Sequence, residues 1–233
     1  MRRLEDVLRR SYPTLEDPAG AIREGRVLVD GSVVTNPASM VRRTASVALR
    51  RSAELRGETK LRAALWALHV APRGLVALDA GSATGGFVKA LLDAGAQRVY
   101  AVDVGHGQLL GSLRQDARVV NLEATNIAGL DARLVPDSVD LVTLDLSYLS
   151  LTAAVPYLDR LSLSPGAQLL ALVKPMFELR LSRPPDYEPR LEQALRLAEA
   201  GITAAGWSVL GSIRSPVLGA RGAVEFFVHA RRA

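Results

Sequence analysis

From residue 74 onward the sequence alternates between short apolar, β-branched runs and amphipathic stretches, and this alternation restricts the fold more than any other feature. Helices are expected at 85–94 and 191–205, and strands separated by helices form a mostly parallel sheet covered on both faces. We therefore predict an α/β fold with a seven-stranded Rossmann-like sheet. The expected strands are 75–78, 98–102, 118–122, 139–144, 168–173, 207–210 and 224–228.

The first fifty residues follow a different pattern. Short helices are expected at 4–10 and 17–24, followed by a hairpin centred on Asp30-Gly31 and a strand at 45–49. An Asp-Gly pair between two apolar runs is a strong signal for a two-residue hairpin turn. We predict a small α+β domain over residues 1–50, a linker over 51–59 and a large domain over 60–233. A unit of about fifty residues is marginally stable alone.

Positive charge is concentrated at the N-terminal end. Residues 1–60 hold 12 basic and 8 acidic side chains, and the remainder holds 17 and 16. Such a segment favours a polyanionic partner such as nucleic acid, and a merely solvated basic surface is the alternative. Of the 29 basic residues, only Lys60, Lys89 and Lys174 are lysine. Lysine can lose its proton in a suitable site whereas arginine cannot, so these positions are candidates for chemistry.

Other features of the composition exclude whole classes of site. The chain contains no cysteine, which rules out disulfides, thiolate zinc sites and a cysteine nucleophile, and fits a reducing cytoplasm. No apolar run approaches the ~18 residues of a membrane span, so no membrane partner is expected. His69, His106 and His229 lack metal-ligand spacing, and no metal is expected. Trp66, Trp207 and Tyr157 lie in periodic apolar stretches and are expected in the core.

A glycine-rich turn follows the first strand of the large domain, from Asp79 to Phe87. Such a turn lets a ligand approach the backbone closely at the carboxyl edge of the sheet. The turn lacks the Lys of a phosphate-binding P-loop. Asp103 ends the next strand, where an acid can accept hydrogen bonds from both hydroxyls of an adenosine ribose. The pattern favours a cofactor that has a ribose and no essential phosphate, and S-adenosylmethionine fits this description better than NAD.

Longer motifs make this expectation specific, and residues 60–233 resemble the TlyA family of S-adenosylmethionine-dependent ribosomal RNA 2′-O-methyltransferases. These are relatives of the FtsJ-type enzymes and are often named haemolysins. Ahead of them, residues 21–31 resemble an S4 domain, a small RNA-binding module. The blocks that carry the larger resemblance are Thr84-Gly-Gly-Phe87, Val99-Tyr-Ala-Val-Asp-Val-Gly105, Asp145-Leu-Ser-Tyr-Leu-Ser-Leu151 and Val173-Lys-Pro-Met-Phe-Glu178.

The resemblance implies a catalytic set of Lys60, Asp145, Lys174 and Glu225. A ribose hydroxyl is a poor nucleophile until it loses its proton, so a base and an in-line approach to the methyl group are needed. Lys174 is expected to be that base, because beside another cation its amine loses a proton more readily. Asp145 would orient Lys174, and Lys60 and Glu225 would position the nucleotide.

The resemblance also implies S-adenosylmethionine as the cofactor, and ribosomal RNA or ribosomal subunits as the partner, with cytidine as the acceptor. The oligomeric state is left open by the sequence. The residues expected to bind the cofactor are Asp79, Gly81, Ser82, Thr84, Gly85, Gly86, Phe87, Asp103, Val104, Gln108, Asn126 and Asp145.

Some positions depart from the family pattern. Glu58 stands where the family usually has Gly, and it is expected beside the RNA path, while Lys89 stands where the family has Asp and is expected at the surface. Residues 14–20 are acidic where S4 domains are usually basic. These departures keep two alternatives open. One is a methyltransferase acting on tRNA or a small molecule, and the other is a non-catalytic RNA-binding or ribosome-binding, haemolysin-like protein.

Overall fold

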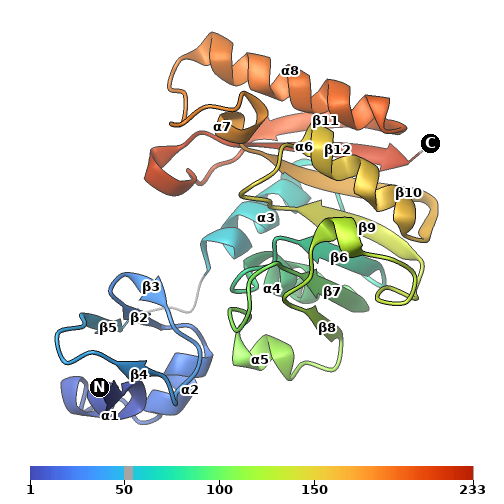
Figure 1. Cartoon of the computed structure of the whole chain (residues 1–233). Coiled ribbons are helices and arrows are strands. Elements are labelled where there is room, and N and C mark those ends of the chain that lie inside the picture. The colour runs from blue at the N-terminus through green and yellow to red at the C-terminus, as the bar shows by residue number, and fades with distance from the viewer. Residues whose placement is uncertain (50–54, 233) are drawn as a thin grey trace.

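The computed structural model describes residues 1–49 and 55–232, and Figure 1 shows a small N-terminal domain beside a larger domain built on a twisted sheet. Helix α3 (Arg56–Ala67) packs on the large domain. The predicted linker extended to residue 59, but Arg56 to Thr59 already form the first turn of this helix. Residues 50–54 of that linker lie outside the described residues.

The small domain contains the two helices and the hairpin that the sequence predicts. Strand β2 pairs with both β3 and β5 in a three-stranded antiparallel sheet, and a second sheet joins β1 to β4. Strands β1 and β4 have two residues each, too few to show a pattern, and they were not predicted. The elements are β1 (Arg2–Arg3), α1 (Leu4–Ser11), α2 (Pro18–Arg23), β2 (Val27–Val29), β3 (Ser32–Val33), β4 (Met40–Val41) and β5 (Val47–Leu49).

Local chemistry explains these elements. Asp30 and Gly31 both adopt positive φ angles, 49° and 83°, as a two-residue turn between twisted strands requires. Asp17 caps α2, since its carboxylate accepts a hydrogen bond of 2.8 Å from the Gly20 backbone N–H. Thus one of the acids at 14–20 stabilises a helix. The core of the domain consists of Leu4, Val7, Leu8, Ala21, Ile22, Val27 and Val41.

The large domain has the seven predicted strands in one mixed sheet of order β11-β12-β10-β9-β6-β7-β8. Only β12 runs antiparallel to its neighbours, β10 and β11, and the pairs among β10, β9, β6, β7 and β8 are parallel. The strands are β6 (Val76–Ala80), β7 (Arg98–Val102), β8 (Val119–Leu122), β9 (Val139–Leu144), β10 (Leu163–Val173), β11 (Trp207–Arg214) and β12 (Phe226–Arg232).

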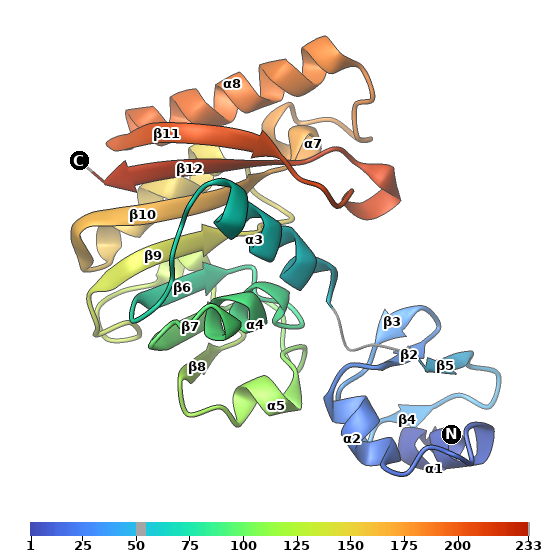
Figure 2. The ribbon, with the colours of Figure 1, turned by 180° about the vertical axis from the view of Figure 1, so that it is seen from behind.

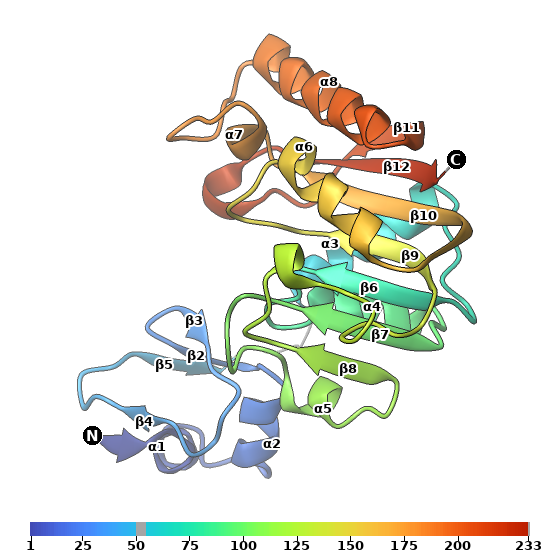
Figure 3. The same cartoon turned by 45° about the vertical axis from the view of Figure 1, so that its right-hand side comes forward.

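Helices cover both faces of this sheet, as expected. Figure 2 shows α3 and α4 on one face, and Figure 3 shows α6 and α8 on the other. Alternate strand residues therefore enter two separate cores. Leu78 and Val142 belong to the core that includes residues of α6 and α8, and Ala77 and Leu141 belong to the core that includes residues of α3 and α4. The remaining helical elements are α4 (Gly86–Asp93), α5 (Gly111–Arg114), η1 (Ile127–Gly129), α6 (Leu151–Ala154), η2 (Val155–Arg160), α7 (Pro175–Glu178), α8 (Glu188–Ala204) and η3 (Ala220–Gly222).

The prediction for one tryptophan was wrong. Trp207 is 1% exposed, as expected, but Trp66 is 82% exposed. Helix α3 buries the face that carries Leu61, Ala64 and Leu65, and Trp66 follows directly after that face and points to solvent. An apolar run on a short helix does not by itself tell which residue at the edge of the stripe is covered.

The strand order reverses between β6 and β9, because β7 and β8 follow β6 on one side while β9 and β10 lie on the other. Ligands of open α/β sheets bind at such a switch point, outside the carboxyl ends of the strands. Gly81 and Asp145 directly follow β6 and β9 and meet there. This topology places the glycine-rich turn beside the residues that follow β9 and β10.

We predict that the small domain unfolds separately when its core is truncated. Ile22 is fully buried, and replacing it by Ala should cost about 2–5 kcal/mol, which a unit of this size cannot absorb. In Ile22→Ala, amide exchange should become fast across residues 1–49 and stay slow in the large sheet. Met40→Ala, at a position that is 52% exposed, is the matched control. Equal loss of protection in both domains would contradict this independence.

Candidate active site

Three adjacent cavities open at the carboxyl edge of the sheet. We name them after one lining residue each: the Lys174 cavity of about 400 Å³, the Asp103 cavity of about 270 Å³ and the Arg56 cavity of about 270 Å³. Asp145 lines all three, Lys174 lines the first two, and Lys60 lines the first and third. Three of the four predicted catalytic residues thus border more than one cavity.

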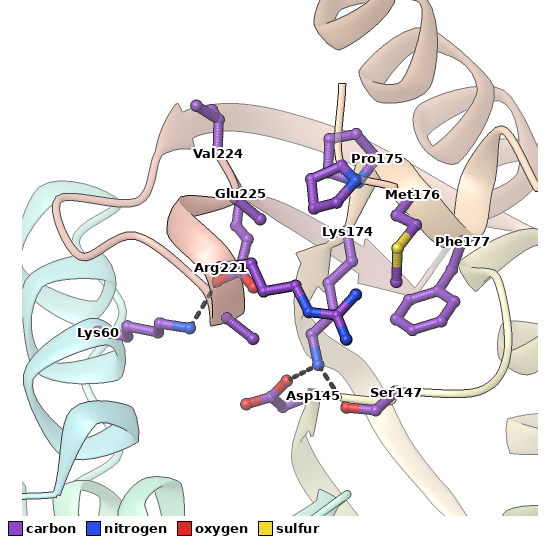
Figure 4. Close-up of a pocket in the computed structure, with 13 residues that line it drawn as sticks. Lys60, Asp145, Ser147, Lys174, Pro175, Met176, Phe177, Arg221, Val224 and Glu225 are labelled. Atoms are coloured by element: carbon purple, nitrogen blue, oxygen red, sulfur yellow. Dashed lines mark hydrogen bonds and ion pairs between the residues drawn. The ribbon is translucent and has the colours of Figure 1, made fainter. Parts of the chain in front are cut away.

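Lys174 follows β10, and its amine forms an ion pair of 2.5 Å with Asp145. It also donates a hydrogen bond of 2.9 Å to the hydroxyl of Ser147 (Figure 4). The side chains of Lys174 and Asp145 are 16% and 23% exposed, so both remain accessible from the cavities. The amine is therefore held at the boundary between the Lys174 cavity and the Asp103 cavity by two acceptors.

The second predicted pair is more deeply buried. Lys60 of α3 and Glu225, just before β12, lie 165 positions apart and form an ion pair of 2.5 Å, with side chains 10% and 6% exposed. Removing one partner of such a pair leaves a buried unpaired charge, which costs about 3–5 kcal/mol. Glu225 is held in place by a close approach of the chain, since a Cβ on Gly219 would overlap its carboxylate.

The Asp103 cavity lies over the ends of β6 and β7. Each carboxylate oxygen of Asp103 accepts one backbone hydrogen bond, from Ala83 N at 2.9 Å and from Gly105 N at 2.6 Å. These two hydrogen bonds fix the carboxylate at the cavity wall, and each oxygen can still accept a further hydrogen bond. Val104 and Ile127 supply apolar lining, and Gln108 and Thr125 supply polar lining.

The glycine-rich turn fits tightly against its surroundings. Gly81 has a φ of 91°, and a Cβ there would overlap the carbonyl oxygen of Asp145. A Cβ on Gly86 would lie 2.9 Å from the Cα of Gly57, so the first turns of α3 and α4 touch through their backbones. Only glycine permits both approaches.

Asp79 lies beneath this turn and is completely buried. Burial raises the pKa of its carboxyl to about 8, and the nearby charges of Asp145 and Asp103 add to the effect, while a hydrogen bond of 2.6 Å from the Thr143 hydroxyl opposes it. Its other oxygen has no hydrogen-bond partner among the described residues. Asp79 is therefore mostly protonated at neutral pH.

Most residues expected at the cofactor do line these cavities. They are Gly81, Ser82, Thr84, Gly86, Phe87, Asp103, Val104, Gln108 and Asp145. Asp79, Gly85 and Asn126 line none of the three: Gly85 precedes α4 with a φ of 96°, and the Asn126 side chain caps η1 by accepting from Ala128 N.

Sequence reasoning did not single out several residues of the site. Ser147 contacts Lys174, and Met176, Phe177, Arg221 and Val224 line the Lys174 cavity. Ser147, Met176 and Phe177 lie inside the two family-like blocks around Asp145 and Lys174, whereas Arg221 and Val224 lie outside any block. Only the fold shows that these side chains face one cavity.

Glu123, after β8, supports the loop that follows Asp103. Burial would raise the pKa of Glu123, but hydrogen bonds from Leu109 N, the Asn121 side chain and Gln108 N, with the charge of Arg114, outweigh it and bring the pKa to about 2. An ionised carboxylate therefore holds the Gln108 backbone at 2.6 Å and fixes the rim of the Asp103 cavity.

Two residues that depart from the family pattern, Glu58 and Lys89, contact each other. Glu58 is only 3% exposed, and one of its oxygens accepts from Lys89 at 2.9 Å and from Arg62 at 2.6 Å. Lys89 also pairs with Asp93 at 2.7 Å, and its side chain is 35% exposed, in agreement with the expected surface position. Together the two residues tie α3 to α4.

Comparison with known proteins shows which family the chain matches. Residues 54–232 match the model of the FtsJ-like methyltransferase family. The chain is 40% identical over 225 residues to the 16S/23S rRNA (cytidine-2′-O)-methyltransferase TlyA of Mycobacterium tuberculosis, covering 93% of this chain and 84% of the relative. It is 31% identical to Hemolysin A of Brachyspira hyodysenteriae, covering 89% and 90%.

The chain belongs to the FtsJ-like methyltransferase family. A solved structure provisionally named as a hemolysin, from Streptococcus thermophilus, matches 100% of this chain and 88% of its own length, with a TM-score of 0.74 and 29% identity. The predictions of an enzyme, of a methyltransferase and of S-adenosylmethionine as its cofactor are confirmed by this membership. The alternative of a non-catalytic protein is thereby set aside.

The residues present fit that cofactor. The Asp103 and Arg56 cavities share Gly81, Ala83 and Asp145, and together they reach the volume of roughly 300–1,000 Å³ that small-molecule sites occupy. Asp103 can accept from ribose hydroxyls, and Val104 and Ile127 offer an apolar slot for a base. The buried hydroxyl of Ser82, on the turn between the two cavities, has no hydrogen-bond partner among the described residues.

Two features are absent from the part of the chain that the structure describes. None of its helices is long and apolar enough to cross a membrane. Within residues 1–49 and 55–232, no group of three or more His, Cys, Asp or Glu is placed to hold a metal ion.

We predict that Asp79 makes the free energy of unfolding depend on pH. Between pH 4 and 8 the folded state binds one proton more than the unfolded state, so stability falls as pH rises, by about 1.4 kcal/mol per pH unit. Asp79→Asn keeps the acceptor for Thr143 and removes this slope. In urea unfolding, the free energy of unfolding of Asp79→Asn relative to wild type should be higher at pH 8 than at pH 5. For the exposed control Asp186→Asn this difference from wild type should be the same at both pH values. Parallel profiles for all three proteins would contradict the burial argument.

Proposed function

We propose that this protein transfers a methyl group from S-adenosylmethionine to a ribose 2′-hydroxyl of ribosomal RNA, with cytidine as the acceptor nucleoside. The observation that carries the proposal is the Lys174 amine, held by Asp145 and Ser147 where the Lys174 cavity meets the Asp103 cavity. A base at this boundary can reach an acceptor on one side and face a methyl donor on the other.

When bound, S-adenosylmethionine supplies a methyl group on a positively charged sulfur, which keeps the electrons of the broken bond. The chain supplies the base and the alignment. In its neutral form, the Lys174 amine takes the proton of the 2′-hydroxyl. Asp145 keeps the amine directed at the boundary between the Lys174 cavity and the Asp103 cavity. Once the amine is protonated, Asp145 forms the ion pair with it again. General bases of this kind contribute about 10²–10⁴-fold in rate.

Lys60 and Glu225 act on the acceptor side. Their ion pair closes one wall of the Lys174 cavity, opposite the apolar side chains of Met176 and Phe177. A slot with apolar and charged walls suits a nucleoside, whose base is apolar on its faces and whose ribose is polar. We infer that this pair positions the ribose while the base lies against the apolar wall.

The small domain supports an RNA acceptor. We propose that it is an S4-like RNA-binding domain over residues 1–50, joined by a linker at 51–59 to the methyltransferase domain at 60–233. Exposed arginines on α1, on α2 and beside β4 can contact phosphates, namely Arg9, Arg10, Arg23, Arg42 and Arg43. The M. tuberculosis relative is named as an enzyme of ribosomal RNA. An enzyme acting on ribosomal subunits would work in the cytoplasm.

The test is transfer of radiolabelled methyl to ribosomal subunits that lack the modification. We expect Lys174→Ala to reduce the rate by about 10³-fold, because the general base is lost, while the affinity for S-adenosylmethionine, measured by calorimetry, stays within a few-fold. Arg196→Ala, on the outer face of α8 and 67% exposed, is the control and should behave as wild type.

Salt dependence separates the acceptor classes. Affinity for ribosomal RNA should fall steeply as salt increases, because binding releases counterions from phosphates. No label on either subunit, despite measurable cofactor binding, would contradict the ribosomal acceptor. Activity insensitive to salt would point instead to a small-molecule acceptor.

A further inference from the structure

The Lys174 cavity carries an unbalanced charge. Its lining contains three cations, Lys60, Lys174 and Arg221, and two carboxylates, Asp145 and Glu225. Each lysine is paired with one carboxylate at 2.5 Å. Both acids are therefore already used, and Arg221 is the cation left over.

Arg221 has no anionic partner in the protein. Within the described residues, no carboxylate lies within 4.0 Å of its guanidinium and no acceptor is hydrogen-bonded to it. Figure 4 shows the side chain reaching across the cavity toward Lys174 and Met176, away from the loop that carries it. Arg221 is exposed, so a ligand arriving from solvent can reach the guanidinium directly.

The backbone at this position would suit a different residue. Arg221 has φ 57° and ψ 27°, the left-handed region that glycine occupies most easily, and Gly222 follows with a φ of 75°. The turn is closed by a hydrogen bond of 2.7 Å from Gly219 N to Ala223 O. Strained backbone conformations of non-glycine residues are concentrated at functional sites. The arginine at this strained position therefore points to a function of its side chain.

We propose that Arg221 binds a phosphate group of the RNA strand next to the acceptor ribose, which makes the Lys174 cavity selective for a nucleotide within a chain. This rests on the proposed function. Every ribose in RNA is flanked by phosphates, and the planar guanidinium binds phosphate through two parallel hydrogen bonds. A free nucleoside or an uncharged small molecule would leave this cation unpaired.

The other candidate anion is the carboxylate of the cofactor. Arg221 lines only the Lys174 cavity, whereas the turn at residues 81–87, which the cofactor must contact, lines the other two. The arrangement therefore favours the phosphate, and the two anions predict different effects on binding.

The experiment compares Arg221→Gln with wild type in methyl transfer to ribosomal subunits over a range of salt concentrations. We expect KM for the subunit to rise about tenfold or more, since hydrogen bonds to charged groups are the stronger class. The slope of log affinity against log salt should fall by about one, the value for one lost phosphate contact. The kcat and the dissociation constant of S-adenosylmethionine should stay within twofold.

Two further variants distinguish a phosphate contact from a general loss of charge and from a structural role. Arg196→Gln removes an exposed arginine outside the cavity and should leave KM and the salt slope unchanged. Arg221→Gly relieves the strained backbone, so its melting temperature should be equal to or above that of wild type while its KM rises as in Arg221→Gln. A purely structural role for Arg221 would lower the melting temperature instead, and that result would overturn the proposal.

Other outcomes would also overturn it. An unchanged KM and salt slope in Arg221→Gln would show that no phosphate is bound there, with the proposed function intact. Weaker binding of S-adenosylmethionine would assign the guanidinium to the cofactor. A wild-type protein that labels no RNA would overturn both this proposal and the proposed function.

Discussion

The close approach of Gly81 to the backbone of Asp145 is the constraint on which the site depends. It joins the turn after β6 to the end of β9 at the point where the strand order reverses, and no side chain fits between them. Because Asp145 is held there, it lines both the Lys174 cavity and the Asp103 cavity. Lys174, one strand further along, is then within ion-pair distance of it.

Electrostatics follows from this geometry. Several charged side chains are buried at this edge of the sheet, and an unpaired buried charge is destabilising. The protein offsets this by pairing Lys60 with Glu225 and Lys174 with Asp145. Asp79, which forms no ion pair among the described residues, is held protonated by burial. The cation that remains, Arg221, is exposed and lines the Lys174 cavity, so it adds a positive charge to that cavity.

Most of the fold could be predicted because its signals are local. The strand–helix alternation and the Asp30-Gly31 turn depend on neighbouring residues, and they gave the sheet and the hairpin correctly. The convergence of Lys60 with Glu225 came from a family resemblance, since spacing carries no information about residues 165 positions apart. The pairing of Glu58 with Lys89 was missed for the same reason: two departures from a pattern look independent until the contact between α3 and α4 joins them.

The central claim is that the acceptor is a ribose hydroxyl rather than a base. Alkaline hydrolysis of the labelled RNA tests it directly, because cleavage of the chain needs a free 2′-hydroxyl. If the Lys174 amine acts on that hydroxyl, the label will be recovered in alkali-resistant dinucleotides. Label recovered in mononucleotides would mean that a base was methylated, and would contradict the mechanism built on Lys174 and Asp145.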